Sequence, residues 1–200
     1  MAERPRVAIA LLAAGRSQRF GAQDKLAAEL GGKPLGLYAA HTLARCEAES
    51  RWVIASSADH PCAEGWRAAG FDIAVNPRAS EGMGTSVALA AELAKREGAD
   101  SLLVALADMP LVPLAHFRAV LDAADGVAGH GVVASSSGAV PMPPACFNRA
   151  RFDELMQLEG DKGARSLLQD ARLITCPAEY LADVDDPTTL ADLRKKLGAS

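Results

Sequence analysis

Apolar positions along the chain fall into two patterns: short continuous runs and longer amphipathic stretches. The short runs hold five to seven residues and are rich in Val, Ile, Leu and Ala. Such runs are typical of strands that are covered on both faces of a sheet. They predict strands at 6–12, 51–57, 71–75, 101–107, 131–135 and 171–176.

The longer stretches between these runs have the spacing of amphipathic helices. They predict helices at 34–44, 60–69, 84–96, 113–123, 149–158, 164–170 and 185–198. The last of these carries the clearest start and stop signals, because Asp186 stands at the N-cap, Pro187 at the first helical position and Lys195 in the last turn.

Strands and helices that alternate in this way predict βαβ units and an α/β fold, a three-layer α/β/α arrangement around a mostly parallel sheet. One segment interrupts the alternation, the proline-rich stretch 135–146. We interpret it as a loop insertion or as a crossover with a short extra strand. The length of 200 residues predicts one domain, 1–200.

Composition narrows the function classes. The net charge of −4 argues against general binding to nucleic acid or to a membrane surface, since both need a basic face. The apolar stretch near the N-terminus is too short to span a bilayer, so we expect a cytoplasmic protein. The four cysteines are far apart and form no metal-binding pattern, which predicts idle, buried thiols; they are Cys46, Cys62, Cys146 and Cys176.

The stretch LLAAGRSQRFGAQDKL, 11–26, follows the first predicted strand and holds Arg16, Arg19 and Lys25. The small residues before them, Ala13 to Gly15, would let the backbone approach a phosphate closely. It matches neither a Walker A loop nor a G-x-G-x-x-G fingerprint. From the residues alone, a solvated surface loop and a cradle for a strongly anionic ligand are both open.

Two carboxylate positions are candidates for a metal. Asp108 ends the strand 101–107, where ligands of open α/β sheets are found, although it could also cap the following turn. Asp186 is explained by helix capping. Asp183 and Asp185 are not, and on an extended segment they share one face, where they could supply a second carboxylate or form an acidic turn.

Five segments, in order, resemble the MobA-like nucleotidyltransferases of molybdenum-cofactor synthesis, with the cytidylyltransferase branch the most similar. The first loop resembles the signature L-A-A-G-x-S-x-R-x-G…K. The other four are NPRASEGMGTSVALA (76–90), LADMP (106–110), LEGDKGARSLL (158–168) and DVDDPTTL (183–190).

The resemblance implies a Rossmann-like nucleotide-diphospho-sugar transferase fold and a Mg²⁺-dependent transfer of CMP from CTP to a phosphorylated acceptor such as molybdopterin. Arg16, Lys25 and Asp108 would be catalytic, and Asp108 and Asp185 would hold Mg²⁺. A molybdoenzyme or its chaperone would be the protein partner. Nucleotide contacts would come from Leu12, Ala13, Ala14, Gly15, Arg16, Lys25, Gly82 and Ser86. The form A-A-G, rather than A-G-G, favours CTP over GTP.

The sequence departs from the family on the side expected to meet the acceptor. Met142-Pro143-Pro144 stands where many cytidylyltransferases carry G-H-P, and Ala107 and Met109 flank Asp108 in place of Gly and Gln. Two alternatives therefore stay open beside molybdopterin. The acceptor could be another sugar or alcohol phosphate, or the chain could bind a nucleotide or cofactor without turnover. The histidines His41, His60, His116 and His130 lack the context of a catalytic triad, and we expect surface or helix-face roles for them.

Overall fold

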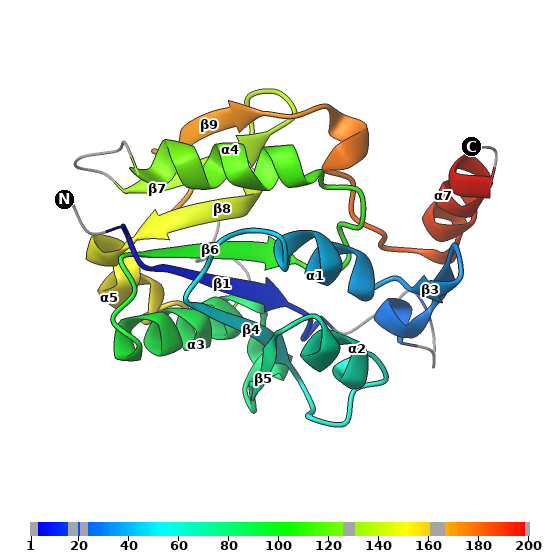
Figure 1. The fold of residues 1–200 in the computed structure, drawn as a ribbon, viewed down its shortest axis with the longest axis horizontal. Coiled ribbons are helices and arrows are strands. Elements are labelled where there is room, and N and C mark those ends of the chain that lie inside the picture. Colours follow the sequence, from blue (N-terminus) through cyan, green and yellow to red (C-terminus); the bar gives the residue numbers. More distant parts are fainter. Residues whose placement is uncertain (1–3, 16–19, 21–23, 126–130, 161–166, 199–200) are drawn as a thin grey trace.

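The structure, a computed structural model, describes residues 4–15, 20, 24–125, 131–160 and 167–198. A sheet of seven strands forms its centre, in the spatial order β5-β4-β1-β6-β8-β7-β9 (Figure 1). The strands are β1 (Val7–Leu12), β4 (Ser50–Ala55), β5 (Asp72–Val75), β6 (Ser101–Leu106), β7 (Val132–Ser136), β8 (Met142–Asn148) and β9 (Arg172–Thr175). Four neighbouring pairs are parallel, and only β8 runs antiparallel to its neighbours in this sheet.

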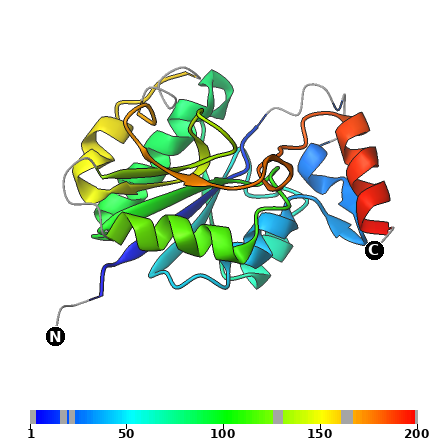
Figure 2. The same cartoon turned by 90° about the horizontal axis from the view of Figure 1, so that it is seen from above.

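Helices cover both faces of the sheet, which confirms the expected three-layer α/β fold (Figure 2). The helices on one face are α1 (Leu37–Leu43), α2 (Ala63–Ala68) and α4 (Leu114–Asp125), and those on the other are α3 (Met83–Arg96) and α5 (Phe152–Leu155). Strand β1 shows why both faces are apolar. Its odd positions, such as Ile9, pack on the α1 face and its even positions, such as Ala10, on the α3 face, and the four residues 8–11 are fully buried. No helix among the described residues is long and apolar enough to cross a membrane.

A third apolar cluster lies apart from the sheet, where the C-terminal helix α7 (Pro187–Gly198) meets the hairpin of β2 (Glu29–Leu30) and β3 (Lys33–Pro34) (Figures 1 and 2). We call it the satellite cluster; its buried members are Leu30, Leu35, Val184, Leu190 and Leu193. The guanidinium of Arg194 on α7 adds a hydrogen bond to the carbonyl of Glu29. The cluster therefore joins the segment just after Lys25 to the segment that holds Asp185.

The proline-rich segment 135–146 is the main correction to the expected elements. The loop insertion is wrong, whereas the extra strand is present but longer than expected, because the second half of the segment begins β8, a seven-residue strand inside the sheet. Pro143 and Pro144 lie where the pairing of β8 with β7 shifts register, and the pairing with β6 begins only at Ala145. Prolines are tolerated there because a bulge does not require their missing N–H groups.

Two predicted helices are also wrong in part. The stretch 149–158 forms a 3-10 turn (Arg149–Arg151) followed by the four-residue helix α5. Of the predicted helix 164–170, the part that the structure describes, 167–170, is a turn. The α7 prediction is confirmed, since the Asp186 carboxylate accepts the N–H groups of Thr188 and Thr189 at 2.8 and 2.9 Å.

Gly84 brings α3 into direct backbone contact with the segment after α5. Its N–H donates to the carbonyl of Gly160 at 2.8 Å, and a Cβ at this position would lie 2.5 Å from the same oxygen. We predict that Gly84→Ala lowers the free energy of unfolding by about 1–3 kcal/mol, because the backbones must separate. Urea unfolding measures this, with Gly138→Ala as the control, since a Cβ there meets nothing within 4 Å. Equal stability of the two variants would contradict the prediction.

Candidate active site

Three residues from distant parts of the sequence meet at the carboxyl end of β6. The Lys25 ammonium lies 2.6 Å from Oδ2 of Asp108 and 3.1 Å from Oδ1 of Asp185. The side chains of Lys25 and Asp108 are 10% and 18% exposed, whereas Asp185 is about half exposed at 46%. The fold thus brings together the cation and both metal-binding carboxylates that the sequence predicted.

Backbone and apolar contacts hold the Asp185 segment in place. The N–H of Val184 donates to the carbonyl of Asp108 at 2.9 Å, which fixes the two acidic segments side by side. The Val184 side chain is buried in the satellite cluster, while Asp183 is exposed and Asp185 partly so. This alternation is that of an extended segment, as expected from the sequence.

The site holds more negative than positive charge among the described residues. Burial lowers the pKa of Lys25, but Asp108 and Asp185 outweigh this effect and hold the pKa above its usual value, so the amine stays protonated. Burial, together with Asp185 and Asp108, raises the pKa of the Asp183 carboxyl. Within the part of the chain that the structure describes, one ammonium therefore faces several carboxylates, an arrangement that attracts further positive charge.

The second carboxylate oxygen of Asp108 carries more specific information. This Oδ1 is buried and has no hydrogen-bond partner among the described residues. A buried carboxylate oxygen without a partner is costly in free energy, so such an atom needs an explanation. A hard cation such as Mg²⁺, which prefers carboxylate oxygen, fits this position. Within the described ranges, no group of three or more His, Cys, Asp or Glu side chains could hold a metal ion.

Asp24 and His60 support the segment that carries Lys25. Asp24 accepts the N–H of Leu26 at 2.8 Å, which caps the 3-10 turn Lys25–Ala27, and its other oxygen lies 2.8 Å from Nε2 of His60. His60 is 7% exposed and stacks on Trp66, and its Nδ1 accepts the N–H of Cys62. Since Nδ1 is an acceptor, the ring hydrogen is on Nε2, which lies close to Asp24 but outside hydrogen-bond geometry.

The first loop leaves the sheet at the position expected for a ligand cradle. Leu12 and Ala13 are buried, and the Ala13 N–H donates to the carbonyl of Ile54 at 2.8 Å, so the chain stays in the sheet up to this point. Ala14 is partly buried and Gly15 is exposed, and a Cβ at Gly15 would meet no described atom within 4 Å. Toward the described part of the chain, the backbone at Gly15 is therefore open. Arg16 lies outside the described residues.

Gly82 and Ser86 lie at the N-terminal end of α3. Gly82 is the residue before the helix and has φ of 123°, a conformation that favours glycine. Ser86 is 3% exposed, and its hydroxyl accepts a hydrogen bond from the amide of Asn76 at 2.9 Å. The same amide donates to Thr85 Oγ1, so Asn76 ties the end of β5 to the first turn of α3.

Comparison with known proteins agrees with this geometry. A sequence model of the MobA-like NTP transferase domain matches residues 9–176. The chain belongs to this family. It is 31% identical to the purine catabolism protein PucB of Bacillus subtilis over 174 residues, 81% of this chain and 80% of PucB.

Several solved structures share the fold. Rv0371c from Mycobacterium tuberculosis superposes with a TM-score of 0.77 at 22% identity, over 97% of this chain and all of that one. A second structure of Rv0371c, in complex with manganese, gives 0.72 at 22% identity, over 95% and 98% of the two chains. CMP:2-keto-3-deoxy-manno-octonic acid synthetase, in complex with CTP, gives 0.72 at 16% identity, over 97% and 99%.

Some side chains around the site were missed or misjudged at the level of sequence. His60 was expected at a surface or on a helix face, yet it is buried and precedes α2; His116 does lie on a helix face, the buried one of α4, where it contacts Ser135 Oγ at 2.8 Å. The role of Asn76 was also missed, although its place in the motif N-P, directly after a strand, was a usable signal. The cysteine prediction is confirmed, since all four thiols are free and buried. His130 lies outside the described residues.

The Asp24 carboxylate gives the site a pH-dependent support. Burial raises its pKa, but His60 and the N–H groups of Leu26 and Ala27 outweigh burial and hold the pKa below the usual 3.8. The stabilisation is therefore present above pH 3.8 and is lost as the pH falls through the lower, folded value. We predict that Asp24→Ala lowers the free energy of unfolding by about 1 kcal/mol at neutral pH.

Urea unfolding of wild type and Asp24→Ala, from neutral pH down to about pH 3, tests this linkage. The difference between the two proteins should shrink in the acid part of this range. A difference that stays constant with pH would show that Asp24 acts through packing and not through its charge.

Proposed function

We propose that this chain is a Mg²⁺-dependent cytidylyltransferase, in which residues 1–200 act as a single nucleotidyltransferase domain. It would transfer CMP from CTP to a phosphorylated small molecule such as molybdopterin and release pyrophosphate. The observation that carries the proposal is the meeting of Lys25, Asp108 and Asp185 at the carboxyl end of β6. In open α/β sheets this edge is where ligands bind.

The nucleotide would lie over the end of β1, against the backbone of Leu12 to Gly15. The open space beside Gly15 supports this placement, because a phosphate or base can approach the main chain there. Gly82 and Ser86 would meet the base and ribose from the start of α3, and Arg16 would bind the phosphates. Two observations favour CTP over the other nucleotides: the A-A-G form of the loop and the shared fold with the synthetase solved with CTP.

Asp108 and Asp185 would hold the divalent cation, and the buried, unpartnered Oδ1 of Asp108 supports this assignment. When bound, Mg²⁺ would supply charge neutralisation at the phosphates. The manganese complex of Rv0371c shows that a relative of the same fold takes a divalent metal. Mg²⁺ is typically bound by one or two carboxylates together with substrate phosphates, which matches the two carboxylates here.

The chemistry follows from charge and position. A phosphate oxygen of the acceptor attacks the α-phosphorus of CTP in line, the new P–O bond forms, and the bond to the β-phosphate breaks so that pyrophosphate leaves with its electron pair. Lys25 stays protonated because Asp108 and Asp185 hold its pKa up, and it can therefore bind the leaving pyrophosphate. The reaction needs no covalent enzyme intermediate; catalysis is positioning and stabilisation of charge.

The side of the site expected to meet the acceptor departs from the family's sequence pattern. Pro143 and Pro144, in place of the family's histidine motif, form the bulge of β8 beside β6. A sugar or alcohol phosphate is the second candidate. Its support is the shared fold with 4-diphosphocytidyl-2C-methyl-D-erythritol synthase from Anaerococcus prevotii (TM-score 0.74, 11% identity), whose named product joins cytidine diphosphate to an alcohol.

Pyrophosphate release with Mg²⁺, measured for each of the four NTPs with molybdopterin, tests the proposal. We expect release with CTP and molybdopterin. Release with CTP only when a sugar or alcohol phosphate replaces molybdopterin would support the second candidate. Thermal stabilisation by CTP without release on any acceptor would point to a binding protein without turnover, and neither binding nor release would overturn the proposal.

We predict that Lys25→Met and Asp108→Asn each lower the rate of CTP-dependent pyrophosphate release at least about 100-fold, since each removes a group that stabilises phosphate charge. The matched control is Lys33→Met. Lys33 lies on the hairpin strand β3, and its ammonium contacts the ring of Tyr38 in α1, 4.0 Å from the ring centroid. Circular dichroism checks that each variant is folded. A folded Lys25→Met protein with full activity would remove Lys25 from the site.

Gly15→Ala separates ligand binding from stability. The added methyl group meets no described atom, so we predict a change in unfolding free energy of less than about 0.5 kcal/mol. The dissociation constant for CTP with Mg²⁺ should rise at least about tenfold, because the methyl group displaces the phosphates from the backbone. Calorimetric titration measures this, with Gly138→Ala as the control. Unchanged affinity would place the nucleotide away from this loop.

A further inference from the structure

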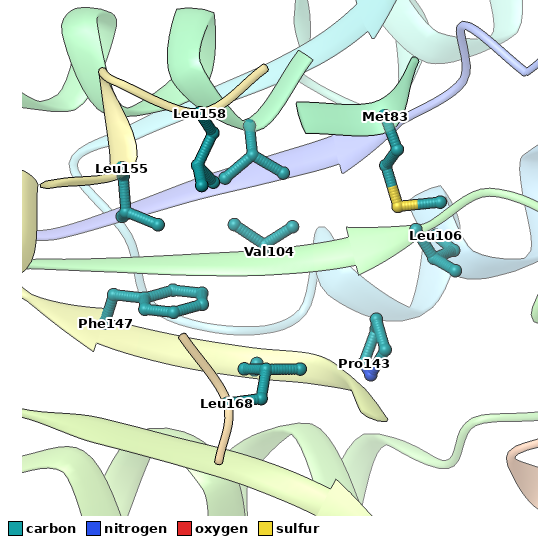
Figure 3. A pocket seen from close by; sticks show the side chains of 10 residues that line it. Met83, Val104, Leu106, Pro143, Phe147, Leu155, Leu158 and Leu168 are labelled. Atoms are coloured by element: carbon teal, nitrogen blue, oxygen red, sulfur yellow. The ribbon is translucent and has the colours of Figure 1, made fainter. Parts of the chain in front are cut away.

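An apolar pocket lies beside β6, on the face of the sheet that α3 and α5 cover (Figure 3). Its volume is about 30 Å³. None of its ten lining side chains is polar or charged. Six of these ten lining residues are Met83, Val104, Leu106, Pro143, Ala145 and Phe147.

The pocket has a buried end and an exposed end. Val104 and Phe147 at the buried end are 3% and 4% exposed, whereas Met83 is 44% exposed. Leu106 and Pro143 are half-buried. Figure 3 shows these last three residues together at the end toward which β6 points. The pocket therefore opens at the carboxyl edge of the sheet, the edge that holds the candidate active site.

The residues at the open end of the pocket are close in sequence to residues of the candidate active site. Leu106 precedes Asp108 by two residues, which corresponds to about 7 Å of extended backbone. Met83 directly follows Gly82. The pocket also lies on the β8 side of β6, whereas the first loop leaves β1 on the other side. If the nucleotide occupies the β1 side, the pocket lies on the side left for the acceptor.

We infer that this pocket is a subsite for a compact apolar branch of the acceptor, a methyl or short alkyl group close to its phosphate. The inference rests on the proposed function with its second acceptor candidate, an alcohol phosphate, because molybdopterin carries no methyl or alkyl branch beside its phosphate. A hydroxyl or a water molecule in this pocket would find no hydrogen-bond partner among the lining side chains, so an apolar group is the suitable occupant. The volume has room for about two methyl-sized groups, so any ring of the acceptor stays outside.

The test compares two phosphates of similar length, 3-methylbutyl phosphate and glycerol 3-phosphate, by calorimetric titration. Both are measured with Mg²⁺, once with and once without the non-hydrolysable analogue α,β-methylene-CTP. We expect 3-methylbutyl phosphate to bind at least about tenfold more tightly, since each buried methyl or methylene group contributes roughly fourfold in affinity. Equal binding of the two phosphates would overturn the inference.

Two variants test whether the pocket causes the preference for 3-methylbutyl phosphate. Ala145→Val fills the buried end and should abolish the preference while the affinity for the analogue stays unchanged. Met83→Ser changes the exposed mouth and leaves the buried end as it is, so the test survives if the first variant fails to fold, and it should reduce the preference several-fold. The control is Leu173→Ser on β9, which is similarly exposed at 39% and does not line the pocket.

The possible results separate this inference from the proposed function. If the analogue binds and folded Ala145→Val and Met83→Ser proteins both keep the full preference, the pocket is a packing void and the inference is wrong. If the analogue does not bind but the preference exists and is lost in the variants, the subsite stands and the cytidylyltransferase proposal falls.

Discussion

A lysine ammonium that is removed from water needs negative charge close by, and in this protein Asp108 and Asp185 meet that need. The pair distances of 2.6 and 3.1 Å join three segments that are 83 and 160 residues apart in the sequence. Removing one partner of such a group would leave charge uncompensated in a poorly solvated position. These ion pairs therefore hold three segments together: the first loop, the end of β6 and the segment before α7.

Two parts of the fold, the sheet and the satellite cluster, hold Lys25, Asp108 and Asp185 in place. The sheet fixes Asp108, because β6 is paired on both sides and its side chains are buried between two layers of helices. The satellite cluster fixes the other two residues, because Leu30 follows Lys25 and Val184 precedes Asp185. The cluster is small and lies apart from the sheet. Local opening there would separate the charges without unfolding the sheet.

The strand order gives the two sides of β6 different chemical surroundings. On the β1 side, a parallel pair ends in small residues and open space at Gly15, a shape suited to a phosphate chain. On the β8 side, the antiparallel strand and its bulge frame an apolar pocket that opens at the same edge. A transferase must hold two substrates of different chemistry within reach of the same charges. This edge offers one polar and one apolar side for that purpose.

The sequence by itself determined the α/β class, the order of most elements and the capping of α7, because these depend on local periodicity and on single residues such as Asp186 and Pro187. It also singled out three candidate site residues: Lys25 in the first loop, Asp108 after a predicted strand and Asp185 at the start of a predicted helix. Only the tertiary structure decided that these three side chains meet, since contacts across 160 residues leave no local signal. The same holds for β8, whose prolines argue against a strand until the register shift places them in a bulge, and for His60, which is buried because Asp24 and Trp66 surround it.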